Sequence, residues 1–347
     1  MGDTDKYPPL HLPARDIPVP STISEEAKAV LGNTAMVPVQ DWPEDLTDKA
    51  AVAKVIDDWV GDMPIEFSAP LFGMALRADG GAQTEHMMLG DVSVYVATPD
   101  GFDESDPRTH MAIHGAFIFG GGKFSQAGAA YTAAALGLRV WAVDYRMPPY
   151  HPHPVPLDDC LVVYRELLER YGARNISIGG TSGGGNLTLA TLLRAQDEGL
   201  PMAAAAVVNT PYADLTHAGD TIQMFYGTVD RSTTPGNLDV IRKIYCDEQD
   251  MRHPYISPVF GDYGSDFPPT LLTSGTRDFL LSDTVRVHRK LLAAGVEAEL
   301  HVWEAAAHYM FAGTAPEDRE HSEQTRLFLQ KHLPASRSPT FAQSHES

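Results

Sequence analysis

Short apolar runs alternate with longer amphipathic stretches over most of the chain. The apolar runs have the length of buried strands and fall at residues 110–113, 139–143, 175–178, 203–208, 270–273 and 298–303. The stretches between them favour helices and fall at residues 127–136, 156–171, 186–195, 283–294 and 317–332. Strands that alternate with helices pair in parallel and are covered on both faces, so the pattern predicts an α/β fold with a mostly parallel central sheet.

Two further features precede this alternation. Residues 84–97 form two apolar segments around Gly90-Asp91, which predicts a β-hairpin. Upstream, residues 24–31 begin like a capped helix, and residues 46–60 are a second helical stretch. The apolar positions of this second stretch fall on one face: Leu46, Ala50, Ala53, Ile56 and Val60. We expect the proline-rich residues 1–20 to run extended over the surface.

Residues 211–262 interrupt the alternation. They are rich in Asp, Tyr, Thr and Pro and contain one helical run, near residues 238–245. The segment is longer than a connection between strands needs, so it is either an inserted lid or a decoration of the surface. The polar residues from Pro334 onward are expected to be disordered.

One glycine-rich stretch carries candidate chemistry, because Gly180-Thr181-Ser182-Gly183-Gly184 matches Gly-x-Ser-x-Gly. A predicted strand precedes Ser182 and a predicted helix follows it, which is the context that a nucleophile elbow requires. Glycines on either side let neighbouring backbone approach, and the helix N-terminus favours developing negative charge. A phosphate-binding loop is the alternative, but the lysine that such a loop requires is missing.

A serine hydroxyl is a weak nucleophile without a base to take its proton. Asp278 directly follows a predicted strand and is the best candidate acid, whereas Asp283 is better explained as the N-cap of the next helix. Downstream of Asp278, His308 is the only histidine in a loop that follows a strand. We therefore predict that Ser182 is the nucleophile, His308 the general base and Asp278 the residue that orients the imidazole.

The oxyanion of the tetrahedral intermediate needs backbone N–H donors. One donor should be Gly183, the residue after the nucleophile. The others should come from the turn after the strand at 110–113, at Gly115 and Ala116. The alternative for this glycine-rich loop is a flexible linker.

Composition restricts the possible partners and location. The 347 residues are 43% hydrophobic and 21% charged, as in ordinary globular proteins, and the formal charge of −20 argues against nucleic acid and anionic membranes. No window has the length and apolarity of a membrane span. The cysteines Cys160 and Cys246 form no metal-ligand spacing or disulfide framework, and the first residues lack the pattern of a signal peptide. These features predict a reducing, cytoplasmic location.

Four stretches between residues 85 and 332 are specific in combination. They are the loop at 114–122, Asp144-Tyr145-Arg146 with the Pro/His-rich run that follows it, the elbow, and the pair Asp278 and His308. In this combination the chain resembles the bacterial hormone-sensitive-lipase family of α/β-hydrolases. The resemblance implies an α/β-hydrolase fold with a helical cap, and carboxylesterase activity on short- to medium-chain esters.

The resemblance also implies boundaries within the chain. Residues 1–62 and 211–262 would form the cap, residues 63–210 and 263–333 would form the two parts of the core, and residues 334–347 would be a flexible tail.

The chain departs from the family pattern in two places. The family usually has three glycines between the histidine and an aromatic residue, whereas His114-Gly115-Ala116-Phe117 is one residue shorter. If Phe117 matches that aromatic residue, Gly115 and Ala116 still occupy the donor positions. The elbow has Thr181 and Gly183 where the family commonly has Asp and Ala, and both changes bear on acyl and alcohol preference.

The leading hypothesis is a serine carboxylester hydrolase that acts on small esters through a covalent acyl-enzyme, with no metal or cofactor. The alternatives are a lactone or amide hydrolase with the same triad and a non-catalytic protein that binds a small ligand on the same fold. A metal-dependent hydrolase built on His151 and His153 lacks a zinc motif. The candidate substrate contacts are Phe117, Thr181, Tyr212 and Tyr309. An exposed edge strand would favour a homodimer only weakly, so the oligomeric state stays open.

Overall fold

An eight-stranded sheet organises the part of the chain that the computed structural model describes, which is residues 10–11, 13–32, 38–62, 81–230, 234–313 and 315–334. The strand order is β1-β2-β4-β3-β5-β6-β7-β8. The strands are β1 (Ala82–Leu89), β2 (Val92–Pro99), β3 (Thr109–Ile113), β4 (Arg139–Asp144), β5 (Ile176–Thr181), β6 (Ala205–Asn209), β7 (Thr270–Gly275) and β8 (Ala298–Trp303).

The direction of the strands determines on which edge of the sheet the loops with the candidate site residues lie. Strands β1 and β2 form the antiparallel hairpin predicted around Gly90-Asp91, and β2 pairs antiparallel with β4. The six strands from β3 to β8 are parallel, so their carboxyl ends share one edge of the sheet. The predicted parallel α/β sheet is therefore confirmed, and residues that follow β3, β5, β7 and β8 meet at that edge.

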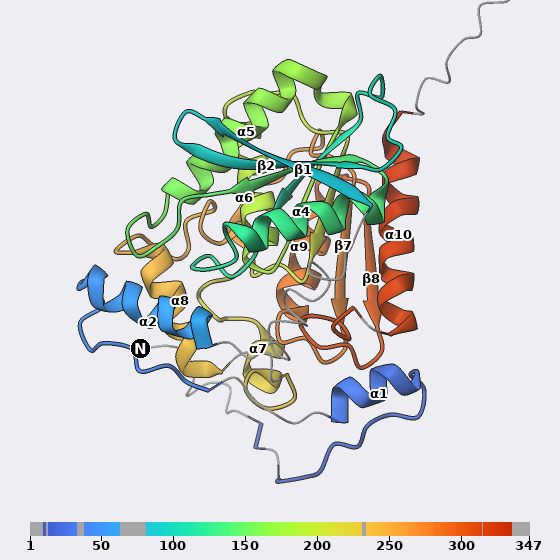
Figure 1. Ribbon diagram of the computed structural model, residues 1–347. Coiled ribbons are helices and arrows are strands. Elements are labelled where there is room, and N and C mark those ends of the chain that lie inside the picture. The colour runs from blue at the N-terminus through green and yellow to red at the C-terminus, as the bar shows by residue number, and fades with distance from the viewer. Residues whose placement is uncertain are drawn as a thin grey trace, which may run out of the picture.

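Helices cover both faces of the sheet (Figure 1). They are α1 (Glu25–Gly32), α2 (Lys49–Asp62), α4 (Lys123–Leu136), α5 (Val155–Tyr171), α6 (Gly183–Asp197), α7 (Asp220–Phe225), α8 (Pro235–Cys246), α9 (Leu281–Ala293) and α10 (Pro316–His332), with short 3-10 turns at Ala173–Asn175 and Pro258–Phe260. Alternating strand residues separate the two layers. Leu271 packs with α10 residues, whereas its neighbour Leu272 belongs to the core that includes α9.

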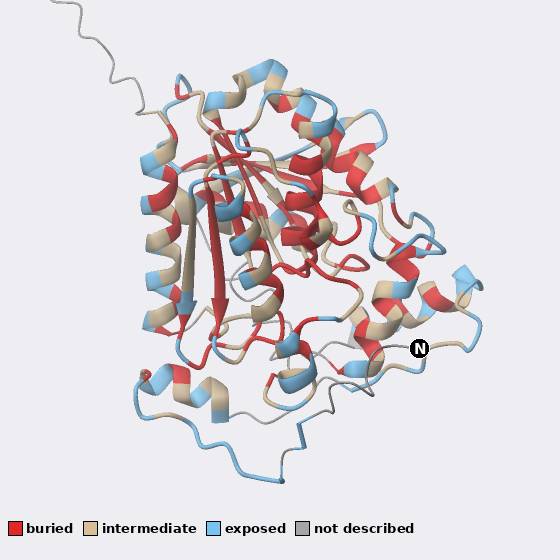
Figure 2. Ribbon diagram, turned by 180° about the vertical axis from the view of Figure 1, so that it is seen from behind, coloured by how far each residue is buried: buried red, intermediate tan, exposed pale blue. Residues whose placement is uncertain are grey.

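Burial follows this layered arrangement. Figure 2 shows the central strands in red and the outward faces of the helices in pale blue. Strand β7 is buried along its whole length, as expected for a strand inside a parallel sheet covered on both faces. On the α4 side the core consists of small residues, with Ala129 and Ala133 packed on Val140 and Ala142.

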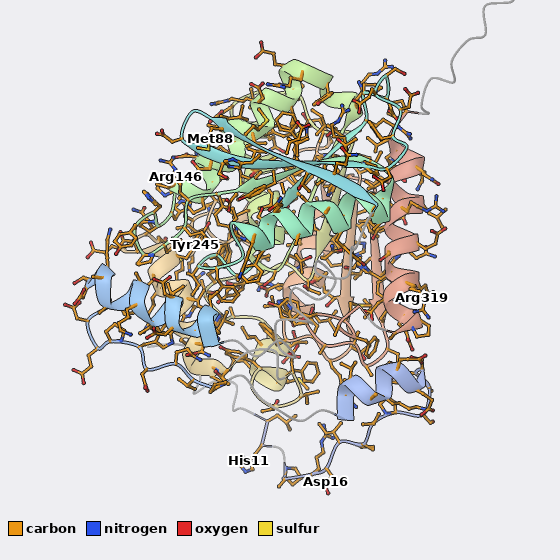
Figure 3. All side chains as sticks on the ribbon, viewed as in Figure 1. His11, Asp16, Met88, Arg146, Tyr245 and Arg319 are labelled. Carbon is orange, nitrogen blue, oxygen red and sulfur yellow. The ribbon has the colours of Figure 1, made fainter. Side chains whose placement is uncertain are left out.

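The remaining helices gather at the carboxyl edge of the sheet. Figure 1 shows α1, α2, α7 and α8 at the end toward which β7 and β8 point. Asn237 on α8 joins the N-terminal segment to the insert, because its side chain accepts hydrogen bonds from Gln40 N at 2.9 Å and Trp42 Nε1 at 3.1 Å. Tyr245 on α8 is fully buried, in contrast to the exposed Met88 and Arg319, and Figure 3 labels all three residues.

Several predicted boundaries shift. Helix α2 begins at Lys49 rather than Leu46. Of the predicted face only Ile56 is buried, together with Val52 and Trp59, whereas Leu46 and Val60 pack partly buried against the core. The prediction chose alanines and missed the tryptophan whose ring meets Phe119 with centroids 5.1 Å apart. Residues 211–262 hold α7 in addition to the predicted helical run. Residues 63–80 and the predicted tail from residue 335 onward lie outside the described part of the chain.

Candidate active site

Ser182 occupies the turn between β5 and α6. Its backbone has φ 58° and ψ −118°, a conformation that L-residues rarely adopt. Its glycine neighbours are needed, because a Cβ at Gly184 would lie 2.0 Å from the Ile113 carbonyl oxygen and one at Gly180 would lie 2.5 Å from Gly184. The sheet and helix therefore approach closely behind the serine, whose side chain faces a cavity.

Asp278 and His308 are in direct contact. Asp278 follows β7, His308 follows β8, and His308 Nδ1 lies 3.1 Å from Asp278 Oδ1. Both residues are almost fully buried, at 0% and 2% exposure. The Asp278 carboxylate also accepts hydrogen bonds from Ser274 Oγ at 2.6 Å and from Leu280 N at 2.9 Å. Three donors thus fix the carboxylate, and its bond to Nδ1 leaves Nε2 as the ring nitrogen available for a reaction.

Ser182 and His308 line the same cavity, which has a volume of about 330 Å³. Tyr309 lines it too, with its hydroxyl near the side chain of Ser182. Burial raises the pKa of the Tyr309 hydroxyl, so this group stays a protonated donor at neutral pH. The three residues proposed from the sequence as a triad thus follow three parallel strands: Ser182 and His308 line the cavity, and Asp278 lies behind His308.

The backbone of His308 is held by a residue that the sequence prediction missed. His308 N donates a hydrogen bond to Asp230 Oδ2 at 2.8 Å, and Asp230 is fully buried. Asp230 belongs to the insert, 78 residues before His308 in the sequence. Nothing in the local pattern around Asp230 signals this contact, because only the tertiary fold brings the two segments together.

The loop after β3 approaches the elbow from the other side. Ala116 and Phe117 have positive φ values of 67° and 62°. A Cβ at Gly183 would lie 3.2 Å from Ala116 N, so the backbone of Ala116 is next to the residue after Ser182. A Cβ at Gly115 would lie 2.8 Å from the Thr181 carbonyl oxygen. The predicted N–H donors Gly115, Ala116 and Gly183 therefore form one compact group.

The Asp144-Tyr145-Arg146 stretch supports this loop. Tyr145 Oη donates toward the carbonyl oxygens of His114 and Gly115 at 3.2 Å each, and its ring stacks on His114 with centroids 4.0 Å apart. Asp144 Oδ1 accepts a hydrogen bond from Gly122 N at 3.0 Å. The end of β4 thus fixes the loop that carries the candidate donors.

The four candidate substrate contacts separate into two pairs. Thr181 and Tyr309 line the cavity. Phe117 is 1% exposed and stacks on Tyr245 with centroids 3.9 Å apart, and Tyr212 is 2% exposed with its hydroxyl bonded to His217. Neither Phe117 nor Tyr212 is among the described residues that line the cavity, and both pack the insert against the core.

Asp283 does not cap its helix, contrary to the prediction. Helix α9 begins earlier, at Leu281, so Asp283 lies inside the first turn. Its Oδ2 accepts a hydrogen bond from Asp214 N at 2.8 Å, which ties the insert to α9. Burial, together with the nearby Asp214 carboxylate, raises the pKa of Asp283 well above its ordinary value.

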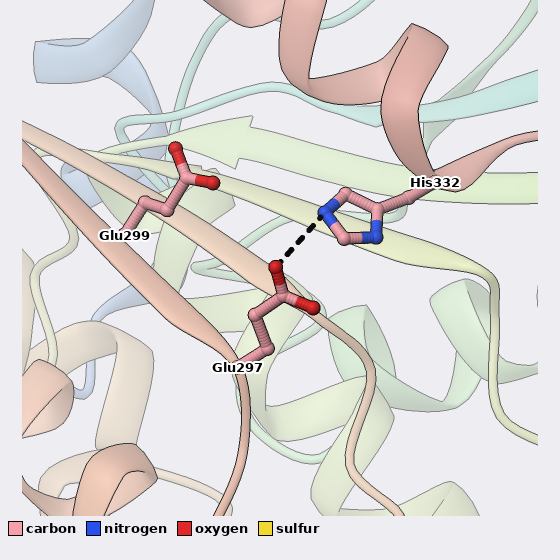
Figure 4. Close-up of side chains that lie close together, drawn as sticks. All are labelled: Glu297, Glu299 and His332. Atoms are coloured by element: carbon pink, nitrogen blue, oxygen red, sulfur yellow. Dashed lines mark ion pairs between the residues drawn. The ribbon is translucent and has the colours of Figure 1, made fainter.

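One group of side chains among the described residues has the composition of a metal site. Glu297, Glu299 and His332 lie together where β8 begins and α10 ends (Figure 4). Lys331 Nζ already donates to Glu297 at 2.7 Å and to Glu299 at 2.9 Å, so a cation of the protein itself pairs with both carboxylates. The group lies at the opposite end of β8 from His308, and we interpret it as an ion-pair cluster.

Comparisons with known proteins agree with this architecture. A family model described as an alpha/beta hydrolase fold matches residues 111–312. An acetyl-hydrolase of Streptomyces hygroscopicus is 30% identical over 234 residues, which cover 65% of this chain and 76% of the relative. An esterase of Acinetobacter venetianus is 30% identical over 200 residues, covering 56% of this chain and 65% of the relative.

Solved structures match over more of the chain. The structure of an esterase called E25 has a TM-score of 0.80 and 33% identity, and the match covers 94% of this chain and 99% of that one. An esterase from the bacterial hormone-sensitive lipase family has a TM-score of 0.72 and 27% identity, with coverage of 90% and 99%. Within the described residues, no helix has the length and apolar character needed to cross a membrane.

Proposed function

The chain belongs to the α/β-hydrolase fold family, within the bacterial hormone-sensitive-lipase group of esterases, and on this premise we propose that it is a serine carboxylester hydrolase. The observation that carries the proposal is the buried Asp278–His308 pair, whose histidine lines the same cavity as a serine on a strand-to-helix turn. Similarity to proteins named esterase and acetyl-hydrolase supports small esters as the substrate class.

In the proposed reaction His308 removes the hydroxyl proton of Ser182 while Ser182 Oγ attacks the ester carbonyl carbon. Asp278, bonded to Nδ1, holds the ring with Nε2 toward the serine and stabilises the imidazolium. The backbone N–H groups of Ala116 and Gly183, with Gly115 beside them, stabilise the oxyanion. The imidazolium then protonates the leaving alcohol, and His308 activates a water molecule that hydrolyses the acyl-enzyme.

Two departures from the family pattern fit this scheme. Ala116 keeps its backbone N–H next to Gly183 at the cost of a positive φ. Gly183 in turn avoids crowding, because a methyl group there would lie 3.2 Å from both Ala116 N and the Phe117 ring. The shortened loop and the extra glycine of the elbow therefore compensate each other. Thr181 and Tyr309 are the proposed substrate contacts, since both line the cavity.

The proposed cap consists of the segments that gather at the carboxyl edge. Trp59 of α2 contacts Phe119 of the loop after β3, and Asn186 of α6 donates to carbonyl oxygens of Tyr212 and Ile256 in the insert, at 2.8 Å each. These contacts, made by residues within 38–62 and within the insert, support the cap that is proposed for residues 1–62 and 211–262. A cytoplasmic location and a homodimer stay predictions. The two cysteines, which are buried and unpaired, suit a reducing compartment.

Replacement of the nucleophile tests the function. We expect Ser182→Ala to lower kcat on p-nitrophenyl butyrate by about 10⁴-fold or more, since removal of a triad member leaves only residual catalysis. Ser105→Ala, in an exposed loop, is the matched control and should keep the wild-type rate. Ser182→Ala with wild-type turnover would refute the proposal.

The alternatives are distinguished by labelling and by a substrate panel. An organophosphate should add covalently to Ser182 in the wild-type protein, whereas a protein that only binds ligands would not react. Esters, lactones and anilides assayed in parallel should show the highest kcat/KM for esters. A higher kcat/KM for lactones or anilides would leave the proposed triad mechanism standing but would show that the enzyme is a lactone or amide hydrolase.

A further inference from the structure

The cavity extends away from Ser182, and residues of the sheet, α4 and α10 line it. Figure 1 shows where these two helices lie beside the sheet. Small residues leave this space open. Ala112, Ala142 and Gly179 line it from the strands, and Gly128 lines it from α4. A Cβ at Gly128 would have no heavy atom within 4 Å. The cavity therefore has room for one arm of a substrate that is attached to Ser182.

Two buried hydroxyl groups in this cavity have no partner among the described residues. Ser125 on α4 is 4% exposed and Thr210 after β6 is 2% exposed, and both line the cavity. A buried hydroxyl without a hydrogen bond costs about 1–3 kcal/mol, so two of them in one cavity indicate that a polar ligand group or water completes them.

The charge of the cavity limits that ligand group. Burial lowers the pKa values of the lining residues His110 and His321 to about 4, so both imidazoles are neutral at pH 7. No lysine or arginine is among the described lining residues, and the one carboxylate, Asp318, accepts hydrogen bonds from Phe311 N at 3.0 Å and Ala315 N at 2.9 Å. An anionic group would find no cation here, whereas a neutral hydroxyl would find both donors and acceptors.

His110 adds a further polar atom. Its Nδ1 is hydrogen-bonded to Ser177 Oγ at 2.9 Å, which leaves Nε2 as the ring nitrogen that a ligand in the cavity can reach. A hydroxyl group can donate to or accept from this nitrogen, whichever tautomer is present. Ser125, Thr210 and His110 thus provide a polar environment of zero net charge.

We propose that this cavity is a subsite for an acyl chain that carries a neutral hydroxyl group, so that the preferred substrates are esters of hydroxy acids. The inference rests on the proposed esterase function. The acyl arm is the one held here, because it stays bonded to Ser182 during both half-reactions. The alcohol, in contrast, must leave before water attacks the acyl-enzyme. If the alcohol were bound in this cavity, which is lined by residues of the sheet, α4 and α10, its release would be hindered.

Matched substrates test the proposal. Hydrolysis of ethyl hexanoate, ethyl 3-hydroxyhexanoate and ethyl 6-hydroxyhexanoate is followed in a pH-stat, with butyl acetate and 4-hydroxybutyl acetate as the pair that changes only the alcohol. We expect at least one hydroxy acid ester to have about 3- to 10-fold higher kcat/KM than ethyl hexanoate, the range of one additional hydrogen bond. Hydroxylation of the alcohol should give no gain.

Two variants locate the preference in the cavity. Ser125→Ala removes one unpartnered hydroxyl, and Gly128→Leu fills the space with a better helix former. Both should bring the ratio of kcat/KM between the hydroxylated and plain acyl esters toward one. Ala134→Leu, on the exposed face of the same helix, should keep the wild-type ratio.

The possible failures are distinct. Hydrolysis of ethyl hexanoate without any preference for its hydroxylated forms overturns the inference and leaves the esterase function standing, because the cavity then holds only water. A gain confined to the alcohol pair, or a wild-type ratio in Ser125→Ala, also overturns it. Absence of Ser182-dependent hydrolysis on every ester refutes the proposed function itself.

Discussion

At the scale of single residues, the candidate site depends on backbone conformations that side chains normally avoid. Ser182, Ala116 and Phe117 all have positive φ, and two of them belong to the loop that supplies the proposed oxyanion donors. Such conformations cost about 1–3 kcal/mol each and persist only where the surrounding structure enforces them. Here Tyr145 and Asp144 hold the loop from β4, so the strain is supported by hydrogen bonds.

Ala116→Gly tests this strain. Glycine adopts φ 67° without a steric penalty, so we expect the free energy of unfolding to rise by about 0.5–1 kcal/mol after the entropy of glycine is subtracted. The value of kcat should fall, because the donor becomes less rigid. Urea denaturation and an ester assay measure the two effects. Ala134→Gly, within α4, is the matched control and should destabilise by about 1 kcal/mol. Equal destabilisation by both changes would show that Ala116 is not strained.

At the scale of elements, the site is assembled by segments that meet at one sheet edge. The three triad candidates follow strands β5, β7 and β8, and residues of α4 and α10 line the cavity beside Ser182 and His308. The N-terminal segment joins this group through Asn237, whose Nδ2 donates to Pro38 O at 2.9 Å while its Oδ1 accepts two hydrogen bonds. One buried amide thus ties residues 38–42 to α8.

Asn237→Ala tests the contribution of this connection. The loss of three hydrogen bonds should lower the free energy of unfolding by about 1–3 kcal/mol. It should also make residues 38–62 more susceptible to limited proteolysis, and KM should rise if these residues cover the site. Asn175→Ala, whose Nδ2 donates only to Tyr171 O, is the control. Unchanged proteolysis and KM in Asn237→Ala would exclude this segment from the cap.

At the scale of the whole molecule, the interior holds several imidazoles in their neutral form. Burial lowers the pKa of His110 to about 4, and the pKa values of His153, His217 and His321 are also lowered to about 4, again mainly by burial. In the unfolded chain these groups titrate near 6.5. At moderately acidic pH, the unfolded chain therefore binds protons on these four imidazoles, whereas the folded protein does not.

The pH dependence of stability tests this property. Between the unfolded value of 6.5 and the folded value of about 4, the unfolded chain binds a proton that folded His110 lacks. Burial of neutral His110 therefore leaves the free energy of unfolding undiminished above pH 6.5. As the pH falls toward 4, this burial lowers the free energy of unfolding by up to about 3 kcal/mol. Urea denaturation at several pH values should show a shallower loss in His110→Gln than in the wild type. Identical slopes would contradict the prediction.

The sequence by itself determined the repeating architecture and singled out the candidate reactive groups. Strand and helix periodicity is local, so the parallel sheet, the hairpin at Gly90-Asp91 and the elbow at Ser182 followed from neighbouring residues. Chain order and position after a strand also singled out Asp278 and His308. In the structure these two residues are hydrogen-bonded, although their catalytic roles stay proposals.

Only the tertiary structure decided which distant side chains support the site and where a substrate fits. Asp230 contacts the backbone of His308 from 78 residues away, and Asp283 bonds the insert instead of capping its own helix. Phe117 and Tyr212 pack inside the molecule, while Ser125, Thr210 and His110 line the cavity. Contacts between residues far apart in the sequence arise when the layers pack together. The local sequence pattern of a segment does not specify which residues will pack against it.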